Sequence, residues 1–321
     1  TMHSWMFINS FEKLRYVVLS QQISSLCHLG TRAFEEIAVD VVQTVEFVFQ
    51  RFHFTNYVGQ YLRLVDDNSQ EKKRLHFLSG KSKYKIQQSE FDIVPGRTLT
   101  YWMPAAISEA FRNCVGLGEI AYPKQGLATA DNNRFLKLWH EVNFTKMRIN
   151  IASPADAKRS GGKWFPHCKG GSYRKGYGNR EFVINWEYDG EEIRSNPSAV
   201  VRNPDTYFKG GYSYSDVSTS SFAVRYYGQG FVFDSTGPML FLDNATKYNG
   251  KTLHVFLNST VANEILKYLC PTIHYTQSAV AKLPLYEINM DASLHDQCVE
   301  LSRIDWDSVE TSWDFKRNPL V

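Results

Sequence analysis

Residues 41–49, Val-Val-Gln-Thr-Val-Glu-Phe-Val-Phe, decide how the first part of the chain is interpreted. β-Branched and aromatic residues dominate this stretch, and Thr44 and Glu46 are its polar interruptions. Such a composition is typical of a β-strand, because branched and aromatic side chains pack well on a pleated surface. We therefore predict a strand here.

The segments around this strand alternate between helix and strand patterns. The expected elements are a helix over 11–21 capped by Ser10, a strand over 23–29, a turn with half a helical turn over 31–37, and a strand over 61–65. The apolar face of the helix is predicted to hold Phe11, Leu14, Val18 and Leu19. Strands separated by helices predict that residues 1–65 are the tail of an α/β sheet whose earlier strands lie outside this chain.

The α/β rhythm ends after residue 65. Charge density rises and the apolar period fades over 66–80, which we interpret as a linker or surface helix. Residues 81–321 are then expected to form an α+β domain. Its predicted elements are helices at 105–112, 132–140 and 260–269, the last ended by Pro271, and strands at 181–186, 222–227 and 231–234. The last two strands flank Gly228-Gln229-Gly230, a connection of hairpin length.

Composition limits the class of protein. With 321 residues, 43% hydrophobic and 21% charged, the chain can bury a large core, and disorder is not expected. It contains no apolar run of about 18 residues and no signal-peptide pattern, so we expect a cytoplasmic protein without a membrane contact. Its five cysteines are widely spaced, which favours neither disulfides nor structural zinc. Because it opens with Thr1 inside an apolar stretch, we expect a piece of a longer protein.

The strongest local signal is residues 158–180. Seven lysines and arginines occur there without an acidic residue, interleaved with glycines and aromatic residues. Cations can neutralise phosphates, glycines allow close backbone approach, and aromatic rings can stack on bases. A solvated basic loop is the alternative reading. The residues proposed to contact DNA are Lys163, Trp164, Lys169, Arg174, Lys175, Tyr177 and Arg180.

Two nearby patterns have competing interpretations. The acidic residues after the basic stretch, from Glu187 to Glu192, could form a metal or catalytic carboxylate cluster, but a polar turn that starts a helix is favoured. His167 and Cys168 are adjacent in sequence, and chain neighbours rarely point at each other, so a catalytic pair is not expected.

Several segments in order resemble the adenine-specific methyltransferases of bacteriophage-exclusion (BREX) systems and, more distantly, single-chain restriction–modification enzymes. The resemblance covers essentially the whole chain. Its main segments are Ser4–Arg15, His28–Phe34, residues 41–49, Gly126–Phe135, Lys163–Pro166, Asn185–Glu191, Phe256–Ser259, Ala281–Pro284 and Glu310–Phe315.

The resemblance implies N6-methylation of adenine in double-stranded DNA with S-adenosylmethionine as donor, by an enzyme that flips the target base out of the helix. It also implies that residues 1–65 are the C-terminal elements of a Rossmann-like methyltransferase sheet and that 81–321 are its target-recognition domain. Phe49 falls where related enzymes place an aromatic that stacks on the flipped adenine, and a core phenylalanine is the alternative; Phe47 is the next candidate.

The family's Asn-Pro-Pro-Tyr/Phe catalytic motif and its glycine-rich donor loop are absent from the sequence. We therefore expect the chain alone to be inactive, to bind no cofactor or metal, and to supply DNA target recognition, with other defence-system proteins as further partners. The alternative is a non-catalytic interaction module whose basic stretch docks a partner protein or an acidic DNA mimic.

Overall fold

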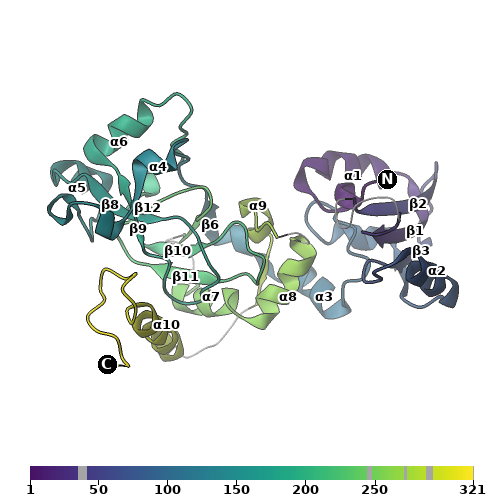
Figure 1. Cartoon of the computed structure of the whole chain (residues 1–321). Coiled ribbons are helices and arrows are strands. Elements are labelled where there is room, and N and C mark those ends of the chain that lie inside the picture. Colours follow the sequence, from purple (N-terminus) through teal and green to yellow (C-terminus); the bar gives the residue numbers. More distant parts are fainter. Residues whose placement is uncertain (35–41, 244–247, 271–272, 287–291, 321) are drawn as a thin grey trace. The chain divides into compact units, whose positions relative to one another are not determined.

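The computed structural model describes residues 1–34, 42–243, 248–270, 273–286 and 292–320 (Figure 1). It has a mixed α/β fold, as the sequence predicts, and divides into two compact units, Thr1–Cys114 and Val115–Val321. Among the described residues, no helix has both the length and the apolar character that a membrane span requires.

The first unit is built on a four-stranded sheet of order β2-β1-β3-β4. β1 and β3 run parallel, with Leu26 opposite Tyr61, and the two outer pairings are antiparallel. The elements are η1 (His3–Met6), η2 (Asn9–Phe11), α1 (Glu12–Val18), β1 (Gln22–Gly30), β2 (Thr44–Gln50), β3 (Val58–Arg63), α2 (Gln70–Ser79), β4 (Lys83–Gln87), η3 (Gln88–Asp92) and α3 (Ala105–Asn113). The predicted strands 23–29, 41–49 and 61–65 are thus observed as β1, β2 and β3, although residues 35–41 lie outside the described part.

Helix α1 forms where the sequence predicts it, but part of its predicted apolar face is wrong. Phe11 and Leu14 are exposed, and Arg15 is fully buried instead. The Arg15 guanidinium donates hydrogen bonds to the carbonyl oxygens of Trp5 (3.0 Å), Ile8 (2.8 Å) and Gly96 (2.6 Å). The Nε and Nη1 donors of Arg15 thus keep partners, which lowers the cost of burying the guanidinium.

Residues 66–80, predicted as a linker or surface helix, carry helix α2 and lie within the first unit. Ser69 caps α2 at its start, and Gly80 ends it in a left-handed conformation (φ 67°). Lys73 is buried and donates from Nζ to the carbonyl oxygen of Leu64 at 2.6 Å. The aliphatic stem of a lysine can pack in a folded unit while its ammonium finds a partner. A segment of high charge density can therefore lie inside a compact unit, as this one does. The compact units meet in sequence at Cys114 and Val115.

The second unit contains two larger sheets. One is antiparallel, of order β11-β10-β13-β6, and the other has the order β12-β8-β9-β7 with β12 parallel to β8. Its helices are η4 (Leu117–Glu119), α4 (Asn132–Phe135), η5 (Trp139–Glu141), η6 (Phe144–Lys146), α5 (Pro154–Arg159), α6 (Glu187–Arg194), η7 (Pro204–Thr206), α7 (Gly250–Leu257), α8 (Thr260–Leu269), α9 (Gln277–Val280) and α10 (Ala292–Trp306). Its strands are β5 (Val115–Gly116), β6 (Ala121–Lys124), β7 (Leu136–Leu138), β8 (Trp164–Cys168), β9 (Phe182–Asn185), β10 (Gly211–Tyr214), β11 (Val224–Tyr227), β12 (Val232–Phe233), β13 (Met239–Leu242) and β14 (Pro284–Leu285).

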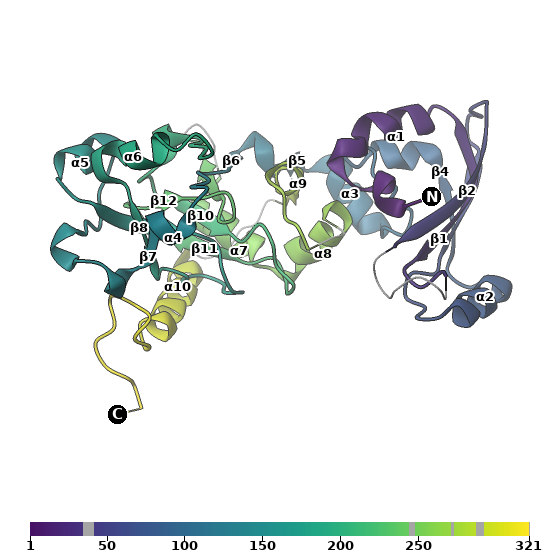
Figure 2. The same cartoon turned by 45° about the horizontal axis from the view of Figure 1, so that its top comes forward.

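The predicted helices at 105–112 and 260–269 and the strand at 181–186 are confirmed as α3, α8 and β9. The helix predicted over 132–140 ends at Phe135, where the chain enters β7. The predicted hairpin around Gly228–Gly230 is not formed, because β11 pairs with β10 whereas β12 joins β8 in the other sheet. Figure 2 shows α5 and α6 side by side next to β8 and β12.

Candidate nucleic-acid interface

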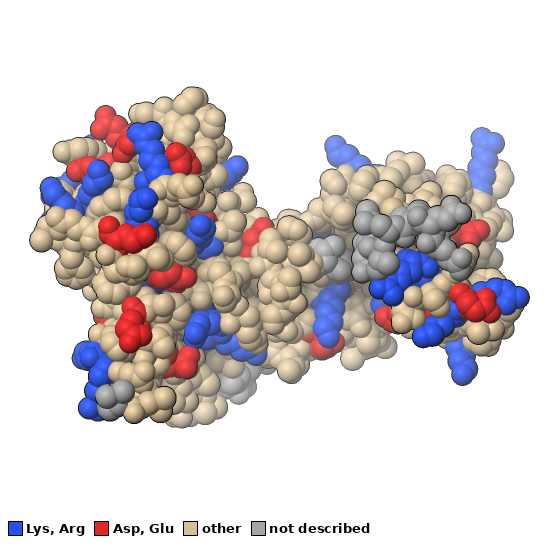
Figure 3. Space-filling view, viewed as in Figure 1, with Lys and Arg blue, Asp and Glu red and all other residues tan. Residues whose placement is uncertain are grey.

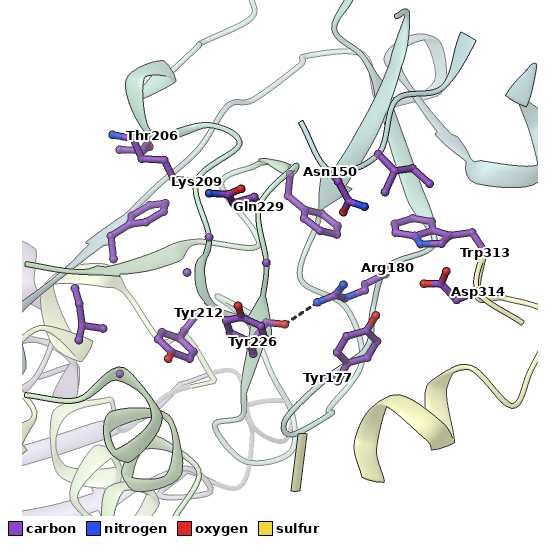
Figure 4. A pocket seen from close by; sticks show the side chains of 18 residues that line it. Asn150, Tyr177, Arg180, Thr206, Lys209, Tyr212, Tyr226, Gln229, Trp313 and Asp314 are labelled. Carbon is purple, nitrogen blue, oxygen red and sulfur yellow. Dashed lines mark hydrogen bonds between the residues drawn. The ribbon is translucent and has the colours of Figure 1, made fainter. Parts of the chain in front are cut away.

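An open groove with a volume of about 1060 Å³ lies in the second unit (Figure 4). Segments far apart in sequence form it, and its lining mixes aromatic rings, amides and two basic residues with one acid. The lining residues are Ile149, Asn150, Tyr177, Arg180, Thr206, Lys209, Gly210, Gly211, Tyr212, Tyr226, Gly228, Gln229, Phe231, Phe241, Leu242, Gly250, Trp313 and Asp314.

The β10–β11 pair places two loops at one end of the groove. Gly211 is opposite Tyr227 in the antiparallel register, so the loop before β10 and the loop after β11 emerge together. A Cβ on Gly210 would lie 3.5 Å from the backbone of Gly228, which shows how closely the loops run. Lys209 is exposed on the first loop, and its ammonium has no partner in the described part of the chain.

A third loop, around Asn150, is fixed against the second. A Cβ on Gly230 would lie 2.9 Å from the backbone nitrogen of Asn150, a distance that only glycine tolerates. Gly230 has φ +106°, and its N–H donates to the carbonyl oxygen of Phe208 at 3.0 Å. Asn150 is itself left-handed (φ 61°), a conformation that asparagine adopts more readily than most residues. The three loops therefore form one braced rim.

Arg180 and Tyr177 form a stacked wall of the groove. The Arg180 guanidinium lies 3.7 Å from the centre of the Tyr177 ring and about 5 Å from those of Tyr227 and Phe231. It donates to the Tyr226 carbonyl oxygen at 2.8 Å, the dashed line in Figure 4. Burial raises the pKa of Tyr177. This arrangement places an aromatic ring and a positive charge stacked on it in the lining of the groove.

The other predicted contact residues of the basic segment lie outside this groove. Lys163 is 3.5 Å from Glu187, and Lys169 lies over the Phe182 ring. Arg174 pairs with Asp305 at 2.8 Å, and Lys175 donates to the Asn258 carbonyl oxygen at 2.7 Å. The two latter residues line a smaller depression beside α10. Trp164 is half-buried on β8.

The lysines and arginines of the acid-free stretch therefore do not gather at one site. Several of them pair with acidic residues from outside the stretch. Figure 3 shows Lys and Arg interspersed with Asp and Glu over the visible face of the second unit. Of the seven predicted contact residues, only Tyr177 and Arg180 line the groove. A sequence window cannot reveal acids that folding brings close, such as Asp305.

The acidic stretch after residue 180 forms ion pairs. Glu187 faces Lys163, Asp189 pairs with Arg194, and Glu192 pairs with Arg134. Tyr188, Asp189 and Gly190 are left-handed, so the favoured reading, a polar turn leading into a helix, is confirmed. Within the ranges that the structure describes, no three histidine, cysteine or acidic residues are grouped as metal ligands would be.

His167 and Cys168, which the sequence offered as a nucleophile pair, contact different partners. Cys168 is buried and donates from Sγ to Ser213 Oγ at 3.0 Å, while burial raises its pKa. His167 is buried with its Nε2 3.7 Å from an Asp234 carboxylate oxygen. Successive side chains on a strand point to opposite faces, which accounts for the separation.

Phe49 belongs to the first unit, on edge strand β2. Its side chain is 52% exposed and stacks on Phe47, with ring centres 5.6 Å apart and planes 23° apart. Phe47 packs in turn against Trp5. The ring of Phe49 is therefore supported on one side and open on the other.

Several segments that carry the family resemblance have structural roles. A Cβ on Gly126 would lie 1.9 Å from the Phe233 carbonyl oxygen, so no other residue fits there. Asp131 caps α4 by accepting from the Arg134 N–H. The Asn258 amide bonds both the N–H and the C=O of Val224, which completes the edge of β11.

Among the groove residues that the sequence did not single out are Lys209, Tyr212, Tyr226 and Asn150. The sequence identified Gly228-Gln229-Gly230, but only as a short connection between two strands. An amide residue between two glycines indicates a loop tip whose backbone can approach a ligand closely, and this pattern could have indicated a binding site.

Comparison with known proteins defines the class. The chain is 36% identical over its whole length to an adenine-specific methyltransferase of Escherichia coli O9:H4 (strain HS), and it covers 26% of that protein. It is also 36% identical over its whole length to one of Lacticaseibacillus casei (strain Zhang), of which it covers 28%. The chain is thus similar along its whole length to these two adenine-specific methyltransferases, BrxX and PglX, and it spans about a quarter of their length.

No protein-family model matches the chain. Among solved structures, the type IIG restriction endonuclease BpuSI is similar with a TM-score of 0.34 and 11% identity, over 94% of this chain and 41% of that one.

Proposed function

We propose that this chain supplies DNA target recognition to a site-specific DNA N6-adenine methyltransferase that acts in phage defence. The second unit would bind double-stranded DNA, and the first would be the C-terminal part of the methyltransferase sheet. The observation that carries the proposal is the groove with Lys209, Arg180 and open amides, in a chain 36% identical along its length to adenine-specific methyltransferases.

The lining of the groove suits a nucleic acid. The exposed Lys209 ammonium is available to a phosphate, and the exposed Tyr226 ring offers a stacking surface. Exposed amides at the rim can donate and accept hydrogen bonds with base edges. Asp314 is the acid among the described lining residues, and a carboxylate can accept from a cytosine amino group.

Catalysis belongs to the longer protein in this proposal. The sequence has no Asn-Pro-Pro-Tyr/Phe motif and no glycine-rich donor loop, so its residues do not fit S-adenosylmethionine, and we derive no methyl-transfer step from them. From the first unit we retain one contribution: the open face of the Phe49 ring would stack on the flipped adenine.

Duplex binding by the purified 321-residue chain tests the proposal. Fluorescence anisotropy with a labelled 30-base-pair duplex should show an affinity that falls log-linearly with salt, because bound cations release counterions. Polyglutamate, which is acidic but has no bases, should compete far less than unlabelled duplex. Equal competition by polyglutamate would instead support the module that docks an acidic protein, and absence of duplex binding would reject the proposal.

A further inference from the structure

Two amide side chains stand open at the rim of the groove. Asn150 and Gln229 are both exposed, both line the groove, and neither side chain has a hydrogen-bond partner in the described part of the chain. Figure 4 shows them on the rim with Lys209 beside Gln229. Other amides in this unit are used internally: Asn179 and Asn203, for example, each donate to backbone carbonyl oxygens.

The backbone around both amides is held in place. Gln229 lies between two glycines, and Phe208 fixes the base of its loop. The Phe208 carbonyl oxygen accepts from Gly230 N–H (3.0 Å), and the Phe208 N–H donates to the Phe231 carbonyl oxygen (2.8 Å). Asn150 meets Gly230 backbone to backbone. A braced loop that presents an unpaired amide loses little entropy when that amide forms hydrogen bonds with a ligand.

We propose that Asn150 and Gln229 determine sequence specificity by reading adenines in the major groove of the bound duplex, an inference that rests on the proposed function. The amide of asparagine or glutamine matches the N6 donor and N7 acceptor of adenine with two hydrogen bonds. Because the two residues are on touching loops and successive bases are about 3.4 Å apart, they would read neighbouring base pairs. Lys209, next to Gln229 on the rim, would hold a phosphate and would carry no sequence information.

Carboxylate variants give the sharpest test, because Asp and Glu accept from the cytosine amino group and cannot donate to adenine N7. The chain and its variants Gln229→Glu and Asn150→Asp would be used to select duplexes from a library with randomised positions. The wild-type chain is expected to enrich a motif with adenine at two neighbouring positions. Each variant should lose adenine preference at one of them, by about fivefold to a hundredfold, and shift it toward cytosine.

The matched control is Gln297→Glu, which makes the same charge change at an exposed position on α10 outside the groove. It should lower the affinity for all duplexes and leave the selected motif unchanged. Asn150→Gly, which keeps the left-handed backbone and removes the amide, should relax one position without changing the fold.

The outcomes separate this inference from the function on which it rests. If the wild-type chain selects a motif and both carboxylate variants select the same one, the assignment of Asn150 and Gln229 is overturned while the proposed function stands. If the wild-type chain binds no duplex, both are overturned. Loss of adenine preference at one position in each variant supports the inference.

Discussion

The backbones of Gly230 and Asn150 touch: a Cβ added to the glycine would lie 2.9 Å from the asparagine nitrogen. These residues are 80 positions apart in the numbering, and their contact joins the loop after β11 to the loop that carries Asn150. The groove rim depends on this contact, and the first prediction addresses it.

Gly230→Ala should destabilise the chain by about 1–3 kcal/mol, because the new Cβ meets Asn150 and the residue must hold φ +106°. Urea unfolding measures the change. Gly228→Ala is the control, since a Cβ there would meet nothing within 4 Å, and it should change the free energy of unfolding by no more than about 0.5 kcal/mol. Equal effects of the two substitutions would contradict the packing described for the rim.

Lys209→Ala should weaken binding to all duplexes alike and reduce the slope of log affinity against log salt by about 1, because one phosphate contact is lost. Titrations at several salt concentrations measure this slope. Lys158, an exposed cation outside the groove, is the matched control, and Lys158→Ala should leave the slope unchanged. If instead Lys158→Ala lowers the slope and Lys209→Ala does not, the duplex lies elsewhere.

Arg180→Lys should cost about 1–2 kcal/mol of stability although it keeps the charge. The planar guanidinium contacts the rings of Tyr177, Tyr227 and Phe231 and bonds the Tyr226 carbonyl, which a lysine cannot reproduce. Arg159→Lys, in an exposed ion pair with Asp156, should change stability by less than about 0.5 kcal/mol. Chemical unfolding of both variants tests this. An unchanged free energy of unfolding for Arg180→Lys would show that the stacked guanidinium contributes little to stability.

Acid should destabilise the second unit through His254. This side chain is buried, its Nε2–H donates to the Val224 carbonyl oxygen at 2.9 Å, and its Nδ1 accepts from His295, all of which suit the neutral ring. Burial lowers its pKa from 6.5 to about 4. Below pH 6.5 the unfolded chain therefore binds a proton that the folded chain does not, so stability falls as the pH drops from about 6.5 toward about 4.

This contribution amounts to roughly 3 kcal/mol at most over that range. Unfolding free energies measured every half pH unit should decline less steeply for His254→Gln than for the wild type. His140→Gln, at an exposed position, should reproduce the wild-type slope. Parallel curves for wild type and His254→Gln would show that His254 does not titrate differently on folding.

Phe49→Ala should leave the stability of this chain within about 1 kcal/mol of the wild type, because the ring is half exposed. In the longer methyltransferase, the same change should lower the methylation rate by about tenfold if the ring stacks on the flipped adenine. Phe52→Ala, at a ring 70% exposed, is the control and should be neutral in both measurements. Methylation unaffected by Phe49→Ala would leave this ring a purely structural role.

The local sequence predicted most of the helices and strands whose formation depends on residues close together in the chain. The helical pattern over 260–269 placed α8, in which Ile265 and Leu269 are buried and which Ser259 caps by accepting from the Ala262 N–H. The composition of residues 41–49 placed β2. The ordered segments also indicated the resemblance to adenine-specific methyltransferases that comparison then showed. These signals lie within short windows, where helix capping and strand composition act.

Tertiary structure decided the pairing of strands and the place of each charge. The segments on either side of Gly228–Gly230 have hairpin spacing, yet their partners are β10 and β8, because long-range packing outweighs loop length. Arg15 donates to the Gly96 carbonyl oxygen and Arg174 pairs with Asp305, and no short sequence window contains these contacts. Residues near 150, 209, 229 and 313 line the groove, so the groove exists only once folding has brought those distant segments together.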